Sequence, residues 1–291
     1  MVFKDTFFSR NLSINCRGKL MDLSRPRIMG ILNVTPDSFF DGGRYTNAES
    51  MAVRIRQIVE EGADIIDIGA YSSRPGAEDI SAGEETERLL PALEAVKKMY
   101  PDMPVSIDTF RTEVIMRATQ AFPIDIINDI TGGNGDPDMF DLVAESHLPY
   151  ILMHIQGTPR TMQKDPVYED VVNDIMMFFA HRVEQLTNKG VNDIILDPGF
   201  GFGKTLDHNY TLMASLEVFN SFELPFLVGI SRKSMTYSLL NIDKSHALNG
   251  TTALNMYALT KGASLLRVHD VKEAVETVKL FNFLHKMEKQ G

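Results

Sequence analysis

Short apolar runs alternate along the chain with longer stretches of helical period. Eight short runs are rich in branched side chains and almost continuously apolar, at 27–33, 64–69, 104–109, 124–129, 149–154, 192–197, 225–230 and 264–268. This pattern is typical of strands that are buried on both faces. Between them, apolar residues recur three and four positions apart, and in 168–190 Ile175, Phe179 and Leu186 share one stripe before Gly190. That spacing predicts helices that cover the sheet.

Eight strand and helix units in succession predict a (β/α)8 TIM barrel. We expect one barrel domain over 25–291, preceded by a short N-terminal extension over 1–24 that forms a β-hairpin. A doubly wound open sheet is the alternative architecture. It usually has fewer strands and a glycine fingerprint after the first strand, whereas 33–38 (NVTPDS) contains no glycine.

Composition narrows the class of protein. With 44% hydrophobic residues in 291, the chain can bury a sizeable core. Its formal net charge of −10 disfavours nucleic acid or an anionic membrane as a partner, because both favour a basic face. Charges interrupt the apolar residues of the N-terminus, and Cys16 is the one cysteine. We therefore expect a cytoplasmic protein without a signal peptide or an internal disulfide.

Polar residues stand where the predicted strands end. They are Asn33, Ser72, Ser73, Arg74, Asp108, Asn128, Asp129, His154, Gln156, Asp197, Ser231, Arg232, Lys233, Ser234, Arg267 and His269. Taken singly, an Asp or Asn in such a place often closes a turn or caps a helix, and we interpret Asp129 as a turn residue and Asp270 as a helix cap. Because all strands of a barrel end at one mouth, the whole set predicts a binding site there.

The residue types indicate the ligand. Carboxylates and amides suit a flat nitrogen heterocycle with many donors and acceptors. Arg74, Lys233, Arg267 and His269 suit a phosphoryl anion. Asn33 together with phosphate oxygens suits a magnesium ion, which prefers oxygen ligands, whereas no pair of residues has the spacing of a zinc site.

The stretch 197–204, DPGFGFGK, resembles a nucleotide-binding loop but lacks its spacing. Gly199 and Gly203 are one residue too close for G-x-x-x-x-G-K. We interpret it as a glycine-rich loop that presents an aromatic ring to a planar ligand. For Phe202 this interpretation is favoured over core packing, while for Phe200 the two are equally supported.

Seven motifs in this order closely resemble dihydropteroate synthase: NVTPDSFFDGG, SSRPGA, SIDT, IND, DPGFGFGK, GISRKSM and RVHD. The resemblance covers roughly 26–285. It implies a (β/α)8 barrel, a homodimer and the use of Mg²⁺. It also implies a reaction of folate biosynthesis that joins 6-hydroxymethyl-7,8-dihydropterin diphosphate to 4-aminobenzoate and releases diphosphate.

The resemblance also assigns residues. It implies that the pterin is bound by Asp108, Asn128, Asp197 and Lys233. It implies that diphosphate is bound by Asn33, Ser73, Arg267 and His269, with the metal at Asn33. It implies that aminobenzoate is bound by Phe39, Arg74, Pro75, Phe202 and Ser234. Asp108, Lys233, Arg267 and His269 are the expected catalytic residues, and for Lys233 we follow the family rather than the phosphoryl interpretation.

One motif departs from the family, which commonly has GGESTRPG where this chain has GAYSSRPG. Tyr71 therefore stands in place of the family's Glu. We further expect 34–43 to act as a lid over the site. The expected mechanism is dissociative, with Asp108 stabilising a pterin-methyl cation. Two alternatives remain at this point: a pterin-dependent methyltransferase, which needs no diphosphate site, and a pterin-binding protein without catalysis.

Overall fold

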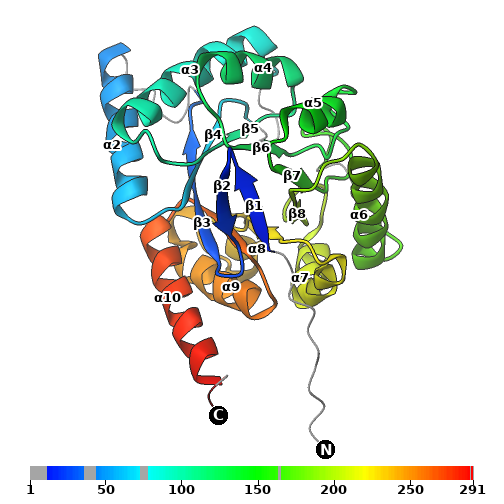
Figure 1. The fold of residues 1–291 in the computed structure, drawn as a ribbon. Helices are drawn as coiled ribbons and strands as arrows, with labels where there is room; N and C mark the ends of the chain where they lie inside the picture. The colour runs from blue at the N-terminus through cyan, green and yellow to red at the C-terminus, as the bar shows by residue number, and fades with distance from the viewer. Residues whose placement is uncertain (1–11, 36–43, 73–77, 163–164, 289, 291) are drawn as a thin grey trace, which may run out of the picture.

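The computed structural model describes residues 12–35, 44–72, 78–162, 165–288 and 290. Within them a sheet of eight parallel strands forms the centre of the molecule (Figure 1). Its strands are β3 (Arg27–Asn33), β4 (Ile65–Gly69), β5 (Val105–Asp108), β6 (Ile126–Asp129), β7 (Tyr150–Met153), β8 (Ile194–Asp197), β9 (Leu227–Val228) and β10 (Leu265–Val268). All eight predicted strands are therefore present. The strand predicted over 225–230 is the shortest.

The order of the strands is that of a barrel. Neighbours run β8-β7-β6-β5-β4-β3-β10-β9, and a parallel bridge between Leu196 and Phe226 joins the two ends. At the same place the Leu196 N–H donates to the Pro225 carbonyl at 3.0 Å. Because the sheet closes on itself, the doubly wound alternative is excluded and the TIM barrel is confirmed.

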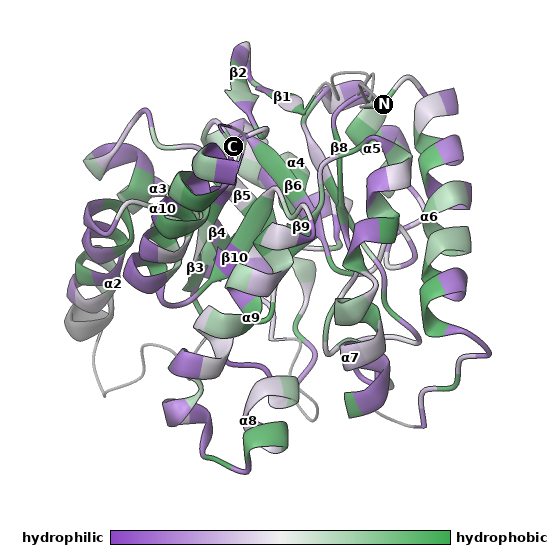
Figure 2. Cartoon of the chain, turned by 90° about the horizontal axis from the view of Figure 1, so that it is seen from below, coloured by the Kyte–Doolittle hydropathy of each residue, from purple (hydrophilic) through white to green (hydrophobic). Residues whose placement is uncertain are grey.

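Helices surround the sheet (Figure 1). They are α2 (Arg44–Glu60), α3 (Ala82–Met99), α4 (Thr112–Ala121), α5 (Met139–Ser146), α6 (Val171–Asn188), α7 (Leu206–Ala214), α8 (Ser234–Leu240), α9 (Leu248–Thr260) and α10 (Val271–Glu288), with 3-10 turns η1 (Leu216–Phe222) and η2 (Lys244–His246). In α6 the predicted stripe buries Ile175, Phe179 and Leu186, and the carboxylate of Asp170 caps the first turn. Figure 2 shows hydrophobic colour along the strands and both colours on the helices.

The interior of the barrel near the N-terminal ends of its strands is a separate apolar cluster. Seven strands contribute to it, through Met29, Ile65, Ile126, Ile151, Ile195, Leu227 and Leu265. The antiparallel hairpin of β1 (Ser13–Cys16) and β2 (Lys19–Asp22) adds Ile14 and Cys16. The hairpin thus covers the N-terminal end of the barrel, which confirms the predicted extension. The C-terminal end is the one at which a barrel carries its active site.

None of the described helices is long and apolar enough to cross a membrane. The domain boundary between residues 24 and 25 stays a prediction.

Candidate active site

The C-terminal strand ends bring polar residues of distant sequence together. Asn33 ends β3, Asp108 ends β5 and Asp197 ends β8. A Cβ placed on Gly69, at the end of β4, would lie 3.4 Å from Asp108 Oδ2 and 3.6 Å from Asn33 Oδ1. Both oxygens therefore border one space at the mouth.

Arg267 on β10 is the electrostatic centre of the mouth. Its Nη2 donates to Asp108 Oδ2 at 2.5 Å, and its Nε donates to Asp67 Oδ2 at 2.7 Å. The guanidinium thus links three strands of the barrel. Burial disfavours its charge, but the carboxylates of Asp67 and Asp108 outweigh burial and raise the pKa of Arg267. Arg267 is therefore a fixed cation beside the predicted pterin site.

Asp67 is a residue that the sequence interpretation missed. It lies inside β4 and is completely buried, and besides Arg267 it binds Asn128, whose Nδ2 is 3.3 Å from each carboxylate oxygen. The signal in the sequence was an aspartate inside the apolar run IIDIG. A carboxylate in such a place must find cationic or hydrogen-bonding partners in the interior. Asp67 therefore orients two predicted site residues at once.

Burial shifts the proton equilibria of the predicted pterin residues. Burial raises the pKa of Asp108 to about 7. Arg267 lowers this pKa, while Asp67 and other carboxylates raise it further. Burial also raises the pKa of Asp197, against the effect of Lys233, and lowers the pKa of Lys233 to about 8. The mouth thus holds groups whose charge changes near neutral pH, as is common in catalytic sites.

Lys233 and the glycine-rich loop are in direct contact. The Lys233 ammonium donates to the Phe200 carbonyl at 2.6 Å and lies 4.5 Å from the centre of the Phe202 ring. Phe202 is half-buried beside this cation, whereas the Phe200 ring is completely buried in the core. Phe200 is therefore a core residue, and the stacking role of Phe202 stays a prediction. Ser234 begins α8 directly after Lys233.

Lys204, the last residue of DPGFGFGK, points into the protein. Its ammonium donates to the carbonyls of Gly199 at 2.9 Å and Phe202 at 3.1 Å, and it lies 3.0 Å from His154 Nδ1. Burial lowers its pKa to about 7. A Cβ on Gly199 would meet the His154 carbonyl at 1.9 Å, so the loop requires glycine there. This lysine braces the loop from inside.

His269 follows β10 and is held by Ser231. The Ser231 Oγ accepts from the His269 backbone N–H at 3.1 Å and lies 3.1 Å from Nδ1 of the ring. Burial, with Arg267 nearby, lowers the pKa of His269 to about 3, so the ring is neutral. The Ser231 hydroxyl can donate its proton to Nδ1, and in that tautomer the ring proton is on Nε2. His269 is then a neutral hydrogen-bond donor.

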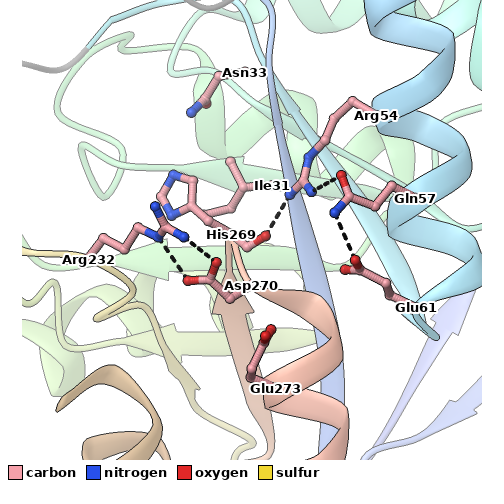
Figure 3. Close-up of a pocket in the computed structure, with 9 residues that line it drawn as sticks. All are labelled: Ile31, Asn33, Arg54, Gln57, Glu61, Arg232, His269, Asp270 and Glu273. Carbon is pink, nitrogen blue, oxygen red and sulfur yellow. Dashed lines mark hydrogen bonds and ion pairs between the residues drawn. The ribbon is translucent and has the colours of Figure 1, made fainter. Parts of the chain in front are cut away.

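A cavity of about 460 Å³ opens beside His269 and Asn33 (Figure 3). Its remaining lining residues are Ile31, Arg54, Gln57, Glu61, Arg232, Asp270 and Glu273. Asp270 accepts two bonds from Arg232, at 2.9 and 2.6 Å. Asp270 stands at the expected cap position, because it directly precedes α10 and its carbonyl accepts from the Ala274 N–H at 3.2 Å, while its carboxylate forms this ion pair. Asp129 is a turn residue as expected, and accepts from the backbone N–H groups of Thr131 and Gly133.

Four predicted site residues and most of the predicted lid lie outside the described residues. They are Phe39, Ser73, Arg74 and Pro75, together with 36–43 of the lid. Tyr71, the departure from the family motif, is described. Its ring makes an edge contact with the Phe110 ring. The guanidinium carbon of Arg111 lies 5.1 Å from the centre of the Tyr71 ring. Here Tyr71 belongs to an aromatic and arginine cluster.

The donor set fits a magnesium ion that is shared with a substrate. In the described part of the chain, no three His, Cys, Asp or Glu side chains form a group that could hold a metal. Asn33 offers one amide oxygen at the mouth. Magnesium is commonly bound by one or two protein oxygens, with phosphate oxygens and water in the other positions. Asn33 is compatible with that mode.

Comparisons with known proteins identify the family. The family described as "Pterin binding enzyme" matches residues 29–269. A dihydropteroate synthase of Escherichia coli (strain K12) is 43% identical over 271 residues, which cover 92% of this chain and 95% of the relative. One of Haemophilus influenzae is 39% identical over 272 residues, covering 93% and 98%.

Solved structures give the same result. The Yersinia pestis dihydropteroate synthase in a sulfonamide drug complex has a TM-score of 0.87 and 42% identity, covering 95% of this chain and 100% of that one. The Xanthomonas albilineans dihydropteroate synthase with 4-aminobenzoic acid has a TM-score of 0.87 and 36% identity, covering 94% and 98%.

Proposed function

The chain belongs to the pterin-binding enzyme family and, within it, to the dihydropteroate synthases, and from this premise we propose the reaction that its site carries out. The chain is a transferase of folate biosynthesis. It joins 6-hydroxymethyl-7,8-dihydropterin diphosphate to 4-aminobenzoate and forms 7,8-dihydropteroate and diphosphate. One observation carries this proposal: Arg267 binds Asp108. The arginine proposed to bind the diphosphate is therefore in contact with the carboxylate proposed to bind the pterin.

The pterin subsite consists of Asp108, Asn128, Asp197 and Lys233. Asn128 and Asp197 are buried, and Asp108 and Lys233 are partly buried beside them. Carboxylate oxygens accept from the amino and ring N–H groups of a pterin, while Asn128 and Lys233 donate to its ring nitrogens and carbonyl oxygen. Each buried polar atom then has a partner, which favours a heterocycle over an apolar ligand.

The diphosphate subsite consists of Asn33, Ser73, Arg267 and His269. Arg267 supplies the cation and neutral His269 supplies an N–H donor. Asn33 would hold magnesium together with diphosphate oxygens, where the ion offsets the negative charge that develops on the leaving group. A chelator should therefore abolish turnover, and added Mg²⁺ should restore it. Full activity in the chelator would contradict the magnesium proposal.

The aminobenzoate subsite consists of Phe39, Arg74, Pro75, Phe202 and Ser234. Phe202 supports this choice, because its half-buried ring flanks Lys233. Structures of relatives carry a sulfonamide drug and 4-aminobenzoic acid. A sulfonamide should therefore raise KM for 4-aminobenzoate in this chain without changing kcat. Inhibition that 4-aminobenzoate does not relieve would contradict a shared subsite.

The proposed chemistry separates bond breaking from bond making. The bond between the pterin methylene carbon and the diphosphate oxygen breaks, and its electron pair leaves with diphosphate. Arg267 and His269 stabilise that anion, and ionised Asp108 stabilises the pterin-methyl cation. The aniline nitrogen then attacks the methylene carbon and loses a proton to solvent. An aniline is already nucleophilic, so the site needs no strong base.

A methyltransferase that uses a methylated pterin is the second candidate. It would need the pterin subsite but no anion subsite, so Arg267, His269 and Asn33 favour the synthase. Methyl transfer from methyl-tetrahydrofolate, without dihydropteroate formation from the two synthase substrates, would reverse this choice. Binding of the pterin without any turnover would instead indicate a pterin-binding protein without catalysis.

We also propose a cytoplasmic homodimer. Helix α10 exposes Leu280, Phe283 and Leu284 by 62%, 64% and 56%. Large apolar side chains gathered on one helix support contact with a second copy. The lone Cys16, a free and buried thiol, supports a reducing compartment. Sedimentation at micromolar concentration should give twice the mass of the chain, and a monomer would contradict the dimer.

A further inference from the structure

Arg54 differs from the other arginines around the mouth. It lies on α2 and points into the cavity beside Asn33 and His269 (Figure 3). Its Nη2 donates to the His269 carbonyl at 2.6 Å and its Nη1 donates to Gln57 Oε1 at 3.0 Å. Both partners are neutral. Among the described residues no carboxylate forms an ion pair with Arg54, whereas Arg232 pairs with Asp270.

Three carboxylates, of Glu61, Asp270 and Glu273, line the cavity, and two of them are directed to other partners. Glu61 accepts from Gln57 Nε2 at 2.8 Å and from the Lys272 backbone N–H at 3.3 Å. Asp270 accepts from Arg232. Burial lowers the pKa of Arg54, and Glu61 and Asp270 offset this only from a distance. A partly buried guanidinium that lacks a neighbouring carboxylate is suited to receive an anion from outside the protein.

Arg54 also has N–H donors that bond to none of the described residues. A guanidinium carries five N–H groups, and two of them make the bonds to His269 and Gln57. The same cavity is lined by Asn33 and His269, two of the four predicted diphosphate residues. A diphosphate whose inner phosphate lies against Arg267 and His269 would extend its terminal phosphate into this cavity.

We propose that Arg54 binds the terminal phosphate of the diphosphate group, and that this cavity is the outer half of the diphosphate site. This inference rests on the proposed function. In the transition state negative charge develops mainly on the oxygen next to the reacting carbon, which the inner phosphorus and the bridging oxygen separate from the terminal phosphate, so the contact with Arg54 changes little in strength between the bound substrate and the transition state. Arg54 therefore contributes to the binding of substrate and of product diphosphate, and not to the rate of the chemical step.

The expected effect separates KM from kcat. Arg54→Gln keeps a long polar side chain but removes the charge and the fork of donors. Loss of a charged hydrogen bond corresponds to a factor of about 10 to 100. KM for the dihydropterin diphosphate should rise by about that factor, and kcat should stay within about threefold of the wild type. Arg54→Lys, which keeps the cation, should recover part of the loss.

The decisive experiment titrates inorganic diphosphate with Mg²⁺ into the full chain by calorimetry. Arg56→Gln is the matched control, because Arg56 lies on the same helix and is exposed. We expect the Kd for diphosphate to rise about 10- to 100-fold in Arg54→Gln and to stay unchanged in Arg56→Gln. Binding of 6-hydroxymethyl-7,8-dihydropterin, which lacks the diphosphate, should be equal in all three proteins.

Two results would overturn the inference. The first is an unchanged diphosphate Kd in Arg54→Gln. The second is an equal loss of diphosphate and pterin binding, which would assign Arg54 to the support of His269 and the surrounding structure. These results leave the proposed function in place if the wild type forms dihydropteroate. A wild type that forms none would overturn the proposed function itself.

Discussion

Asp67 should be as necessary to the site as the residues that touch the substrates. Asp67→Asn keeps the shape of the side chain and removes its charge. Arg267 then loses a carboxylate that its Nε and Nη2 contact at 2.7 and 2.6 Å. The new amide has an NH2 group where the carboxylate had an oxygen. This NH2 group must face an N–H donor, either on Arg267 or on Asn128.

The size of the effect follows from the burial of the pair. Removing one partner of a buried ion pair costs about 3–5 kcal/mol of unfolding free energy. Arg267 keeps Asp108 at 2.5 Å, so the lower end of that range applies. We expect the free energy of unfolding to fall by about 3 kcal/mol, which lowers Tm on the order of 5–10 °C in a domain of this size.

Activity should reveal a second effect of the same substitution. Asp67 is one of the charges that raise the pKa of Asp108 to about 7. Without it the pKa of Asp108 falls, because a like charge is lost and Arg267 has only Asp108 as a carboxylate partner among the described residues. Since ionised Asp108 is the active form, kcat/KM of the wild type should rise with pH through about 7. In Asp67→Asn this rise should move to lower pH.

Urea unfolding and the pH profile of kcat/KM measure the two effects. Ser106→Ala is a suitable control, because Ser106 is buried opposite Asp67 on β5 and its Oγ has no hydrogen-bond partner among the described residues. The control should leave the pH profile unchanged. If Asp67→Asn has the same free energy of unfolding and the same pH profile as the wild type, the role given to Asp67 is refuted.

Three further predictions follow from the same contacts. Asp108→Asn should lower kcat by about 10²–10³ while the Kd for diphosphate changes little, and equal losses in both would sink the role in the cation step. Phe202→Ala should raise KM for 4-aminobenzoate by about tenfold, with a smaller change for the dihydropterin substrate; equal changes would remove Phe202 from that subsite. Burial lowers the pKa of Lys204 to about 7 from 10.5 in the unfolded chain. Between these two pH values the unfolded state binds more protons than the folded state. Lys204 therefore makes the free energy of unfolding increase from pH 7 to pH 10. Urea unfolding at pH 6.5 and 9.5 should show that increase in the wild type and a smaller one in Lys204→Met, whereas equal pH dependence would contradict a buried Lys204.

The barrel was predictable because its signals are local and repeated. Each buried strand is a continuous apolar run, and the polar residues that end the runs must meet at one mouth once the sheet closes. Asn33, Asp108, Asp197 and Arg267 were found in this way. The predicted hairpin is also present, and its apolar side packs against the N-terminal end of the barrel interior.

The contacts inside the mouth were not predictable in the same way. Asp67 stands within a strand, so a search of strand ends overlooks it, and its partner Arg267 is 200 residues away. Asp270 has the sequence position of a cap, but the nearby Arg232 competes for its carboxylate. For Phe200 the sequence left stacking and core packing equally supported, and only the path of the loop places this ring in the core. Such choices depend on tertiary packing.

The most direct test measures both products in one sample. The purified chain is incubated with Mg²⁺, the dihydropterin diphosphate and 4-aminobenzoate, and 7,8-dihydropteroate and diphosphate are quantified over time. The account predicts that the two products form in equal amounts and that both depend on Mg²⁺. Absence of dihydropteroate, with both substrates bound, would contradict the account.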